Sequence, residues 1–131
     1  YCEMLSYYYA PVDKTYAAMA QKNTSLILGL YSLADIGIHH EGWGLSEATI
    51  FFRSHGITDT DSIREIYDLI ISDPANYLKY YVGFLEFLEL KKAAVEKWDS
   101  HFSQQRFHKA VLDVGPAPFE ILRGFTLSAN N

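Results

Sequence analysis

An aspartate and a histidine four residues apart are the first candidates for chemistry in this chain. Asp35 and His39 lie in the segment L-A-D-I-G-I-H-H-E-G-W-G, and on a continuous helix their side chains share one face. A carboxylate that accepts a hydrogen bond from an imidazole fixes its tautomer, which is a common support for catalysis or ligand binding. The same residues also suit a helix C-terminus, where a histidine is favourable and Gly42 and Gly44 end the helix. The two interpretations are compatible, and both stay open.

A second polar row lies on the most apolar helical segment. Asn76, Tyr80 and Gly83 stand at positions i, i+4 and i+7, so one helix face carries an amide, a phenol and bare backbone. This composition suggests the wall of a pocket. The alternative is a packed helix, because apolar and aromatic rows at helical spacing are usually core. Tyr80 and His39 could each donate a hydrogen bond to an oxyanion, given a nucleophile or a metal from elsewhere.

Complete catalytic and metal-binding motifs are absent from the sequence. There is no H-E-x-x-H, no G-x-S-x-G and no Gly-rich phosphate loop. The run His39-His40-Glu41 lacks metal-ligand spacing, because adjacent helical residues point about 100° apart. Cys2 is the only cysteine. We therefore expect no metal-ligating residue and no cofactor in this chain.

Length, charge and hydropathy exclude several classes of protein. The 131 residues are enough for one domain with a real core. The net charge is −5 and no basic cluster is longer than Lys91-Lys92, so the chain has no electrostatic footprint for nucleic acid. The apolar runs are far shorter than the roughly 20 residues that cross a bilayer. We expect no membrane-spanning segment and a chain that is itself soluble.

Two long helices must position the candidate residues. The first is expected near residues 12–39, where apolar residues recur at three- and four-residue steps. The second is expected near residues 74–98, because Asp73 and Pro74 form a strong pair of N-cap and first helical residue. Its first half is apolar on nearly every face and is expected to be buried on all sides, whereas its second half becomes charged.

Shorter helices complete the expected fold, and no alternating run of five or more residues indicates a strand. The predicted class is all-α, with about six or seven helices in a single bundle-like domain over residues 1–131. Ser46 is the expected N-cap of one short helix, and Thr58 or Thr60 that of the next. The short helices are expected before Pro11, over residues 47–54, around Ile63 to Ile71, over residues 103–112 with Leu112 inward, and from about Pro118 onward.

The beginning of the chain reads as the inside of a helix. Tyr1-Cys2-Glu3-Met4 continues a helical pattern, and neither an initiator Met nor a signal peptide is present. We therefore expect a fragment of a larger protein. Tyr7-Tyr8-Tyr9 forms an aromatic surface at the end of this first helix, and it is expected to bind other apolar surfaces. Such a fragment is expected to expose an apolar patch or to form a homodimer that covers it.

Three segments carry a family resemblance. They are A-D-I-G-I-H-H-E-G-W, P-A-N-Y-L-K-Y-Y-V-G-F-L-E-F-L-E-L and F-H-K-A-V-L-D-V-G-P-A-P-F. In this order they resemble the C-terminal part of a bacterial family, domain of unknown function 885 (DUF885), regarded as zinc metallopeptidases. In that family an H-E-x-x-P-G-H-H segment binds zinc, and a helix with E-G-W-A-x-Y-x-E follows it. Both zinc-binding parts would lie upstream, so zinc is expected only in the full-length parent.

One signature of the resemblance covers the histidine segment. By similarity to the helical thimet-type oligopeptidases, His39 would line the substrate cleft. It would donate a hydrogen bond to the carbonyl oxygen of the substrate as zinc-activated water attacks. Asp35 would orient His39. The residues that match the D-x-G-I-H-x-x-G-W signature are Asp35, Gly37, His39, Gly42 and Trp43.

A second signature, Y-x-x-G, covers the long helix that follows. Tyr80 and Gly83 match it, and by the same similarity Tyr80 would be the second catalytic hydrogen-bond donor. Asn76, Tyr81 and Gly83 would bind substrate. Asn76 would alternatively bind Tyr80, and it stands where many relatives carry Gln. Glu3 matches the end of the E-G-W helix and would support the zinc ligand that this chain lacks.

The resemblance implies that the chain is the C-terminal helical half of a zinc-dependent peptidase. It would supply residues that line the substrate cleft and residues that stabilise the oxyanion. Its partners would be the missing N-terminal part of the same protein and a peptide substrate. The chain alone would be inactive. The full-length form would be an extracytoplasmic, membrane-anchored lipoprotein. The alternatives are a non-catalytic helical binding or interaction module, and a scaffold that has lost catalysis.

Overall fold

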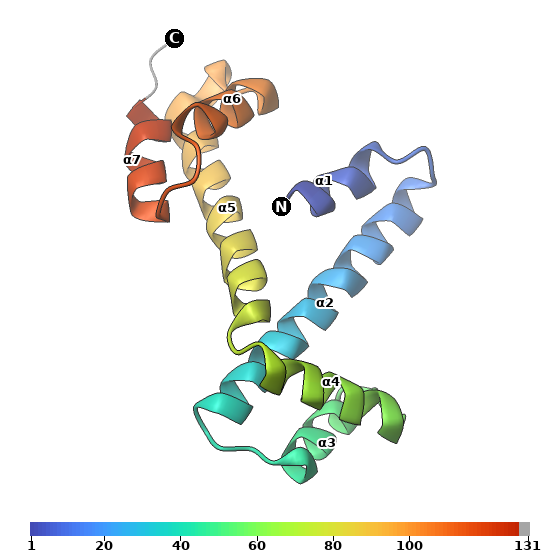
Figure 1. The fold of residues 1–131 in the computed structure, drawn as a ribbon. Helices are drawn as coiled ribbons and strands as arrows, with labels where there is room; N and C mark the ends of the chain where they lie inside the picture. The colour runs from blue at the N-terminus through green and yellow to red at the C-terminus, as the bar shows by residue number, and fades with distance from the viewer. Residues whose placement is uncertain (129–131) are drawn as a thin grey trace. The chain divides into compact units, whose positions relative to one another are not determined.

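Residues 1–128 are described in the computed structural model, and they form seven α-helices and one short 3₁₀-helix without a strand (Figure 1). The prediction of an all-α fold with six or seven helices is confirmed. No described helix is long and apolar enough to cross a membrane. The helices are α1 (Cys2–Tyr9), α2 (Lys14–His39), α3 (Leu45–Ser54), α4 (Thr60–Ser72), α5 (Asn76–Trp98), the 3₁₀-helix η1 (Asp99–His101), α6 (Gln104–Val114) and α7 (Phe119–Ser128).

Backbone contacts divide the chain into two compact units, Tyr1–Gly83 and Phe84–Asn131. The boundary falls inside α5, so the start of this helix belongs to the first unit and the remainder to the second. Both polar groups that the sequence singled out, the Asp35–His39 pair and the row from Asn76 to Gly83, lie in the first unit. The expectation that residues 1–131 form a single domain stays a prediction.

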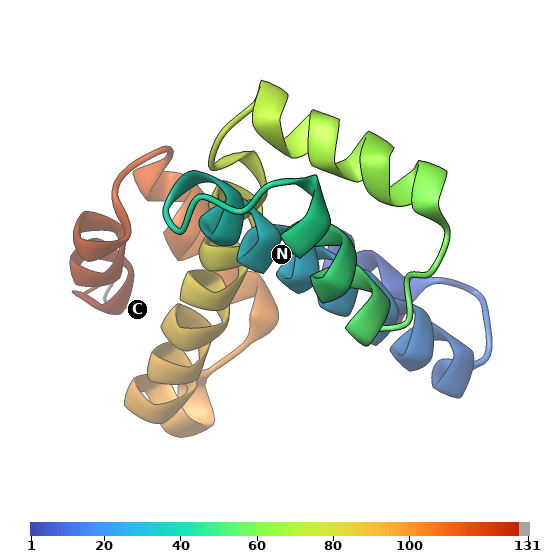
Figure 2. The same cartoon turned by 90° about the horizontal axis from the view of Figure 1, so that it is seen from below.

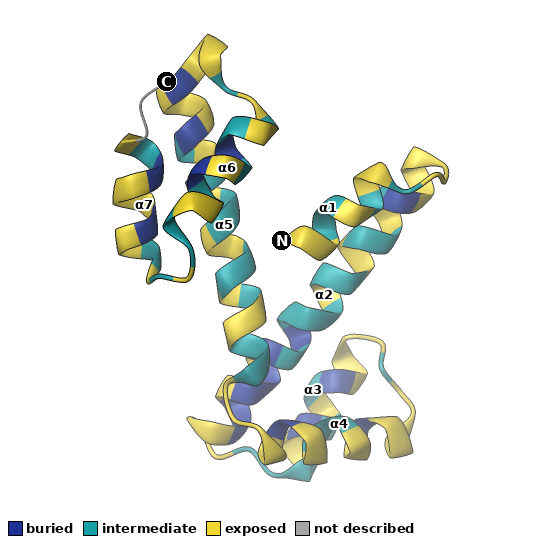
Figure 3. Cartoon of the chain, turned by 45° about the horizontal axis from the view of Figure 1, so that its top comes forward, coloured by how far each residue is buried: buried dark blue, intermediate teal, exposed yellow. Residues whose placement is uncertain are grey.

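The core of the first unit lies where α3 and α4 pack against the second half of α2. These three helices contact one another pairwise, and Figures 1 and 2 show α3 and α4 beside that half of α2. Figure 3 shows buried residues on these three helices in the same place. Each helix has an apolar stripe that it must bury against another element. The core cluster consists of Leu30, Ala34, Ile38, Phe52, Ile63 and Ile70.

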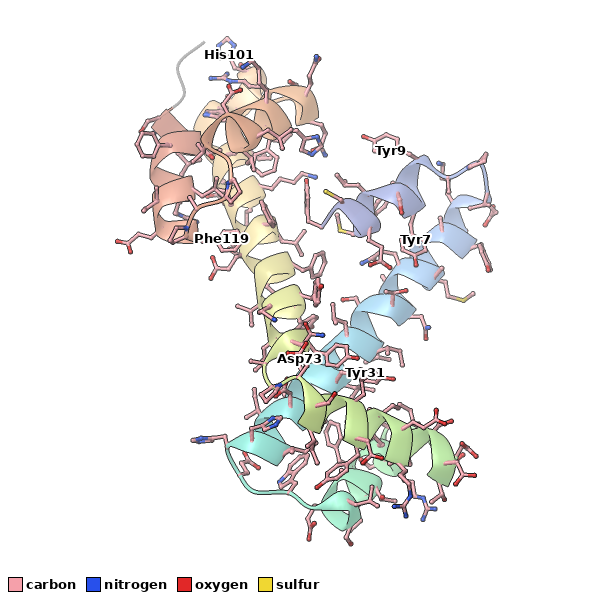
Figure 4. The ribbon with its side chains drawn as sticks, in the orientation of Figure 1. Tyr7, Tyr9, Tyr31, Asp73, His101 and Phe119 are labelled. Atoms are coloured by element: carbon pink, nitrogen blue, oxygen red, sulfur yellow. The ribbon has the colours of Figure 1, made fainter. Side chains whose placement is uncertain are left out.

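The first helix, α1, packs against the first half of α2. Tyr7 Oη and Thr24 Oγ1 lie 3.1 Å apart and share a hydrogen bond. The helix ends before Pro11 as predicted, because Ala10 is extended with φ −61° and ψ 141°, as a residue before proline prefers. Tyr9, at the end of α1, is exposed (Figure 4). The aromatic run at the start of the chain is thus only partly covered.

Acidic side chains set the starts of α2 and α3. Asp13 accepts hydrogen bonds from the backbone N–H groups two and three residues on, at 2.9 and 3.0 Å, so α2 begins at Lys14 rather than at residue 12. Glu47 Oε2 accepts a hydrogen bond from the Gly44 N–H at 3.0 Å. The prediction that Ser46 caps α3 is therefore wrong, since the helix already begins at Leu45.

The start of α4 is capped by an aspartate that stands between the two predicted threonines. Asp59 Oδ2 accepts a hydrogen bond from the Ser62 N–H at 2.8 Å, and hydrogen bonds with Ser62 lower the pKa of this carboxyl. The prediction of Thr58 or Thr60 as the cap is wrong. The carboxylate is the better acceptor for the orphan N–H groups, and it is also favoured at the positive end of the helix.

The start of α5 differs from the prediction of a helix from residue 74. Ala75 has a φ of +63°, which is the left-handed region, so the helix cannot run through it and begins at Asn76. Pro74 therefore lies in the turn between α4 and α5. Asp73, labelled in Figure 4, belongs to the same turn. The N–H of Ala75 is used outside α5, in a hydrogen bond to α2.

The predicted burial along α5 is reversed. Its buried residues are Leu90, Ala94 and Trp98 in the second half, whereas Val82 and Leu85 in the first half are exposed. An all-apolar segment is enclosed only if neighbours surround it. At the start of α5, the Tyr77 ring contacts Tyr31 of α2 and the Tyr81 ring lies against Gly29 of the same helix.

The core of the second unit is formed by the second half of α5 together with α6 and α7. Phe87 packs edge-on against Phe119 of α7, with ring centroids 4.9 Å apart (Figure 4). The Arg106 guanidinium lies 4.3 Å from the centre of the Trp98 ring. Leu112, predicted to point inward, is exposed, because α6 buries its opposite face. The buried apolar residues are Leu90, Ala94, Trp98, Phe107, Ala110 and Leu122.

Candidate functional site

The Asp35–His39 pair forms at the C-terminal end of α2, as the i, i+4 spacing predicted. His39 Nδ1 lies 2.8 Å from Asp35 Oδ1 and 3.1 Å from the Asp35 carbonyl oxygen. The Asp35 side chain is 2% exposed, whereas that of His39 is 31% exposed. A buried carboxylate therefore holds an imidazole whose outer edge reaches the surface.

The hydrogen bonds of His39 determine which ring atom is available. Both groups beside Nδ1 are oxygen acceptors, so Nδ1 carries the proton and donates. Nε2 is then the atom that can meet another molecule. In the neutral ring it can only accept a hydrogen bond or bind a metal, and it donates only from the imidazolium. The predicted role of His39 as a hydrogen-bond donor thus requires the doubly protonated ring.

A third group contacts the same carboxylate. The backbone N–H of Ala75 donates a hydrogen bond to Asp35 Oδ1 at 3.1 Å. The other oxygen, Oδ2, is buried and has no hydrogen-bond partner in the part of the chain that the structure describes. One oxygen of Asp35 therefore joins the end of α2 to the turn that precedes α5.

A glycine and a tryptophan fix the chain beyond His39. A Cβ on Gly37 would lie 2.3 Å from the Trp43 ring, so only glycine leaves room for the indole there. The backbone N–H of Trp43 also donates a hydrogen bond to the Gly37 carbonyl oxygen at 2.9 Å. Gly42, with a φ of +76°, makes the turn that allows this return. These three residues of the D-x-G-I-H-x-x-G-W signature thus have a packing role next to the Asp35–His39 pair.

The row of Asn76, Tyr80 and Gly83 is open rather than packed within the described part of the chain. Tyr80 is 63% exposed and Asn76 is half-buried. A Cβ on Gly83 would meet no atom within 4 Å, so this glycine does not admit a neighbouring helix. Of the two interpretations of this row, the packed helix is not what the first unit contains.

Tyr81 and Tyr77 hold the start of α5 against α2. A Cβ on Gly29 would lie 3.2 Å from Tyr81 Cζ, so the Tyr81 ring rests on that glycine. The Tyr77 and Tyr31 rings meet edge to face at 4.9 Å. Tyr81, predicted to bind substrate, therefore has a packing contact, and its predicted binding role stays a prediction. Figure 4 labels Tyr31 where α2 passes the start of α5.

The two rings at this crossing are phenols with raised pKa values. Burial raises the pKa of Tyr31, and Tyr77 adds to the effect. Burial also raises the pKa of Tyr77, with a further contribution from Asp73. Both hydroxyls are therefore neutral hydrogen-bond donors at neutral pH. The sequence reasoning singled out neither of them, nor Ala75, although the i, i+4 spacing of Tyr77 and Tyr81 could have indicated a packing face.

Glu3 lies exposed in the first turn of α1. That helix contacts α2 at Thr24, which is 11 residues before Asp35 and therefore about 17 Å away along the helix axis. The structure thus places Glu3 on a different helix from Asp35 and His39. Its predicted supporting role concerns residues outside this chain and stays a prediction.

Comparison with known proteins completes the description of the site. Among the described residues, no group of three or more His, Cys, Asp or Glu side chains could hold a metal ion. No curated protein and no solved structure matches the chain. The model of the family described as "Bacterial protein of unknown function (DUF885)" matches residues 1–124. The match covers nearly the whole chain, which therefore belongs to the DUF885 family.

Proposed function

We propose that the chain supplies the C-terminal helical half of a zinc-dependent peptidase, in which His39 and Tyr80 face the substrate. The observation that carries the proposal is the buried Asp35 carboxylate, which holds the partly exposed His39 imidazole in one tautomer. Such an arrangement supports a histidine that must meet a ligand in a fixed orientation. The family resemblance supplies the reaction class, because the geometry alone fits several.

The described residues do not fit a zinc ion by themselves, since they contain no cluster of metal-ligating side chains. The metal would be held by residues outside this chain. What the chain contributes is then hydrogen bonding and binding. The His39 imidazolium would donate from Nε2, and Tyr80, which is exposed on α5, from its hydroxyl. Both donors would stabilise the negative charge that develops on the carbonyl oxygen of the substrate.

The open row on α5 supports a role in binding an extended peptide. Asn76 and Gly83 flank Tyr80 on one helix face, and the bare backbone at Gly83 leaves space beside the phenol. Asn76 offers an amide that can pair with peptide backbone. Tyr81 would act indirectly, by holding this part of α5 against Gly29 of α2.

Exposed apolar residues support a partner that covers α2. Met19, Leu26 and Leu33 follow one another at seven-residue intervals along α2, and all three are exposed. A straight apolar column at this spacing matches a second helix packed alongside. We assign it to the remainder of the same peptidase. The extracytoplasmic lipoprotein form of that parent is likewise a proposal that rests on the resemblance alone.

The test is peptide cleavage by the zinc-loaded full-length parent and its variants, measured on a broad peptide library. His39→Ala and Tyr80→Phe should each lower kcat by about 10²- to 10³-fold, because each removes one oxyanion donor. His101→Ala and Tyr16→Phe are matched controls on exposed residues outside the site and should leave cleavage unchanged. Absence of cleavage by the parent, or full cleavage by both site variants, would contradict the proposal.

The second candidate function is a helical interaction module, favoured by the same exposed apolar column on α2. Sedimentation and binding of a hydrophobic dye distinguish the two functions. A part of a larger fold should bind dye or form a dimer at high concentration, because its interface is uncovered. A self-sufficient module should be a monomer that binds little dye.

A further inference from the structure

The turn between α4 and α5 holds a residue in an unfavourable conformation. Ala75 has a φ of +63°, although it is not glycine, and its side chain is exposed. The left-handed conformation is unfavourable for a residue other than glycine, and it persists only where surrounding interactions impose it. Packing of the Ala75 side chain cannot be the cause, because that side chain faces solvent.

In this conformation the Ala75 N–H donates a hydrogen bond to Asp35, and the turn is also closed by a hydrogen bond from the Asn76 N–H to the Asp73 carbonyl oxygen. The distance from Ala75 to Asp35 is 3.1 Å, and the acceptor is the same Oδ1 that receives the His39 Nδ1 proton at 2.8 Å. Asp35 is buried, and its other oxygen has no partner among the described residues. The orientation of the carboxylate therefore depends on two donors that are far apart in the sequence and meet on one atom.

We propose that Ala75 is a positioning residue for His39, because its backbone N–H holds the Asp35 carboxylate in the orientation that fixes the imidazole. One oxygen atom then fixes the position of two helix ends. They are the start of α5, which carries Asn76 and Tyr80, and the end of α2, which carries His39. A shift of the turn moves the carboxylate and releases the ring. The inference rests on the proposed function for what His39 does to a substrate, but not for its positioning.

The first test uses the unmodified chain. If Ala75 and His39 share one oxygen, protonation of His39 must change the hydrogen bond of Ala75. In the ¹⁵N-labelled 131-residue chain, a pH titration should shift the Ala75 amide proton with the same midpoint that is measured for the His39 ring. His39→Gln should abolish this shift and His40→Gln should preserve it. An Ala75 amide that does not shift, or that still shifts in His39→Gln, would overturn the proposal.

The second test removes the donor. Replacing the Ala75 amide by an ester keeps the methyl group and the carbonyl but deletes the N–H. Long-range ¹H–¹⁵N spectra of the His39 ring should then change from the Nδ1–H tautomer to a mixture of both tautomers. Ala75→Gly is the matched control, because it keeps the N–H and tolerates a positive φ, and it should keep the Nδ1–H tautomer. An unchanged tautomer in a folded ester variant would mean that Ala75 only shapes the turn.

These readouts separate the positioning of His39 from peptide cleavage. If the ester variant does not fold, the pH titration of the unmodified chain still decides. Coupling between Ala75 and His39 without any cleavage by the parent would leave the positioning role intact and contradict the proposed function. Cleavage that depends on His39 without such coupling would contradict the positioning role alone.

Discussion

An acid–base pair at i, i+4 spacing lies on α2 in the first unit, and another lies on α6 in the second. Asp35 and His39 approach to 2.8 Å, and Lys109 and Asp113 to 2.5 Å. On α2 the side chains are 2% and 31% exposed, whereas on α6 they are 62% and 74% exposed. The local helical geometry is the same in both, so the difference must come from the surroundings.

The comparison teaches that a pair becomes a candidate site through its tertiary contacts. Solvent-exposed pairs such as Lys109–Asp113 contribute only about 0–1 kcal/mol, because water competes for both partners. In the α2 pair, a donor 40 residues away, the Ala75 N–H, meets the same carboxylate oxygen. Burial removes the competing water, and the third partner removes rotational freedom. The orientation of His39 is therefore imposed, whereas that of Lys109 is not.

We expect the largest loss of stability around the Asp35–His39 pair from Gly37→Ala, because Gly37 lies between these two residues. The new Cβ would lie 2.3 Å from the Trp43 ring, so the indole must leave its place. We expect the free energy of unfolding to fall by about 3 kcal/mol, the upper range for overpacking. Urea unfolding followed by circular dichroism measures this change.

Gly124→Ala is the matched control in the second unit. A Cβ added to this helical glycine would meet no atom within 4 Å. Alanine there should stabilise the chain by up to about 1 kcal/mol, through helix propensity. Equal effects of the two substitutions would mean that Trp43 does not constrain Gly37, and the packing account of the signature would fail.

Asp35→Ala removes the pair directly, with a smaller expected loss of stability. It leaves the Ala75 N–H and the His39 Nδ1 proton without their shared acceptor, so we expect a loss of about 2 kcal/mol in the free energy of unfolding. Asp113→Ala on α6 should cost no more than about 0.5 kcal/mol. If urea titrations give similar losses for the two variants, burial does not distinguish the pairs.

The sequence was sufficient for the parts of the site that local geometry determines. The spacing of Asp35 and His39 predicted their hydrogen bond, because four residues along a helix bring two side chains together whatever lies around them. The two long helices followed from the same periodicity. The helix starts were less predictable, since Asp59 caps α4 between the two predicted threonines and Glu47 binds the Gly44 N–H at the start of α3.

The remainder depended on contacts between distant residues. Pro74 is a strong signal for a first helical residue, yet Ala75 has a positive φ and donates its N–H to Asp35, and α5 begins two residues later than Pro74. The apolar first half of α5 likewise predicted burial, but its exposure depends on how many helices surround it. The i, i+4 spacing of Tyr77 and Tyr81 places them on one face, but which helix this face meets depends on where α2 crosses, and periodicity does not encode that.

The smallest expected effect concerns the crossing of α2 and α5, and it is a change in the free energy of unfolding at alkaline pH. The pKa values of Tyr31 and Tyr77 are raised in the folded chain, mainly by burial, from an ordinary value of 10.0. The unfolded chain therefore loses these protons first as pH rises. The stability that the neutral phenols contribute is fully present below pH 10 and is lost as pH rises through the folded pKa values.

Tyr31→Phe and Tyr77→Phe keep the ring contact and remove the titrating group, so each should flatten the decline of the free energy of unfolding above that pH. Tyr16→Phe, on an exposed residue of α2, should leave the decline as it is. Urea titrations across this pH range measure it, and an unchanged decline in the double variant would show that the crossing of α5 and α2 does not depend on neutral phenols.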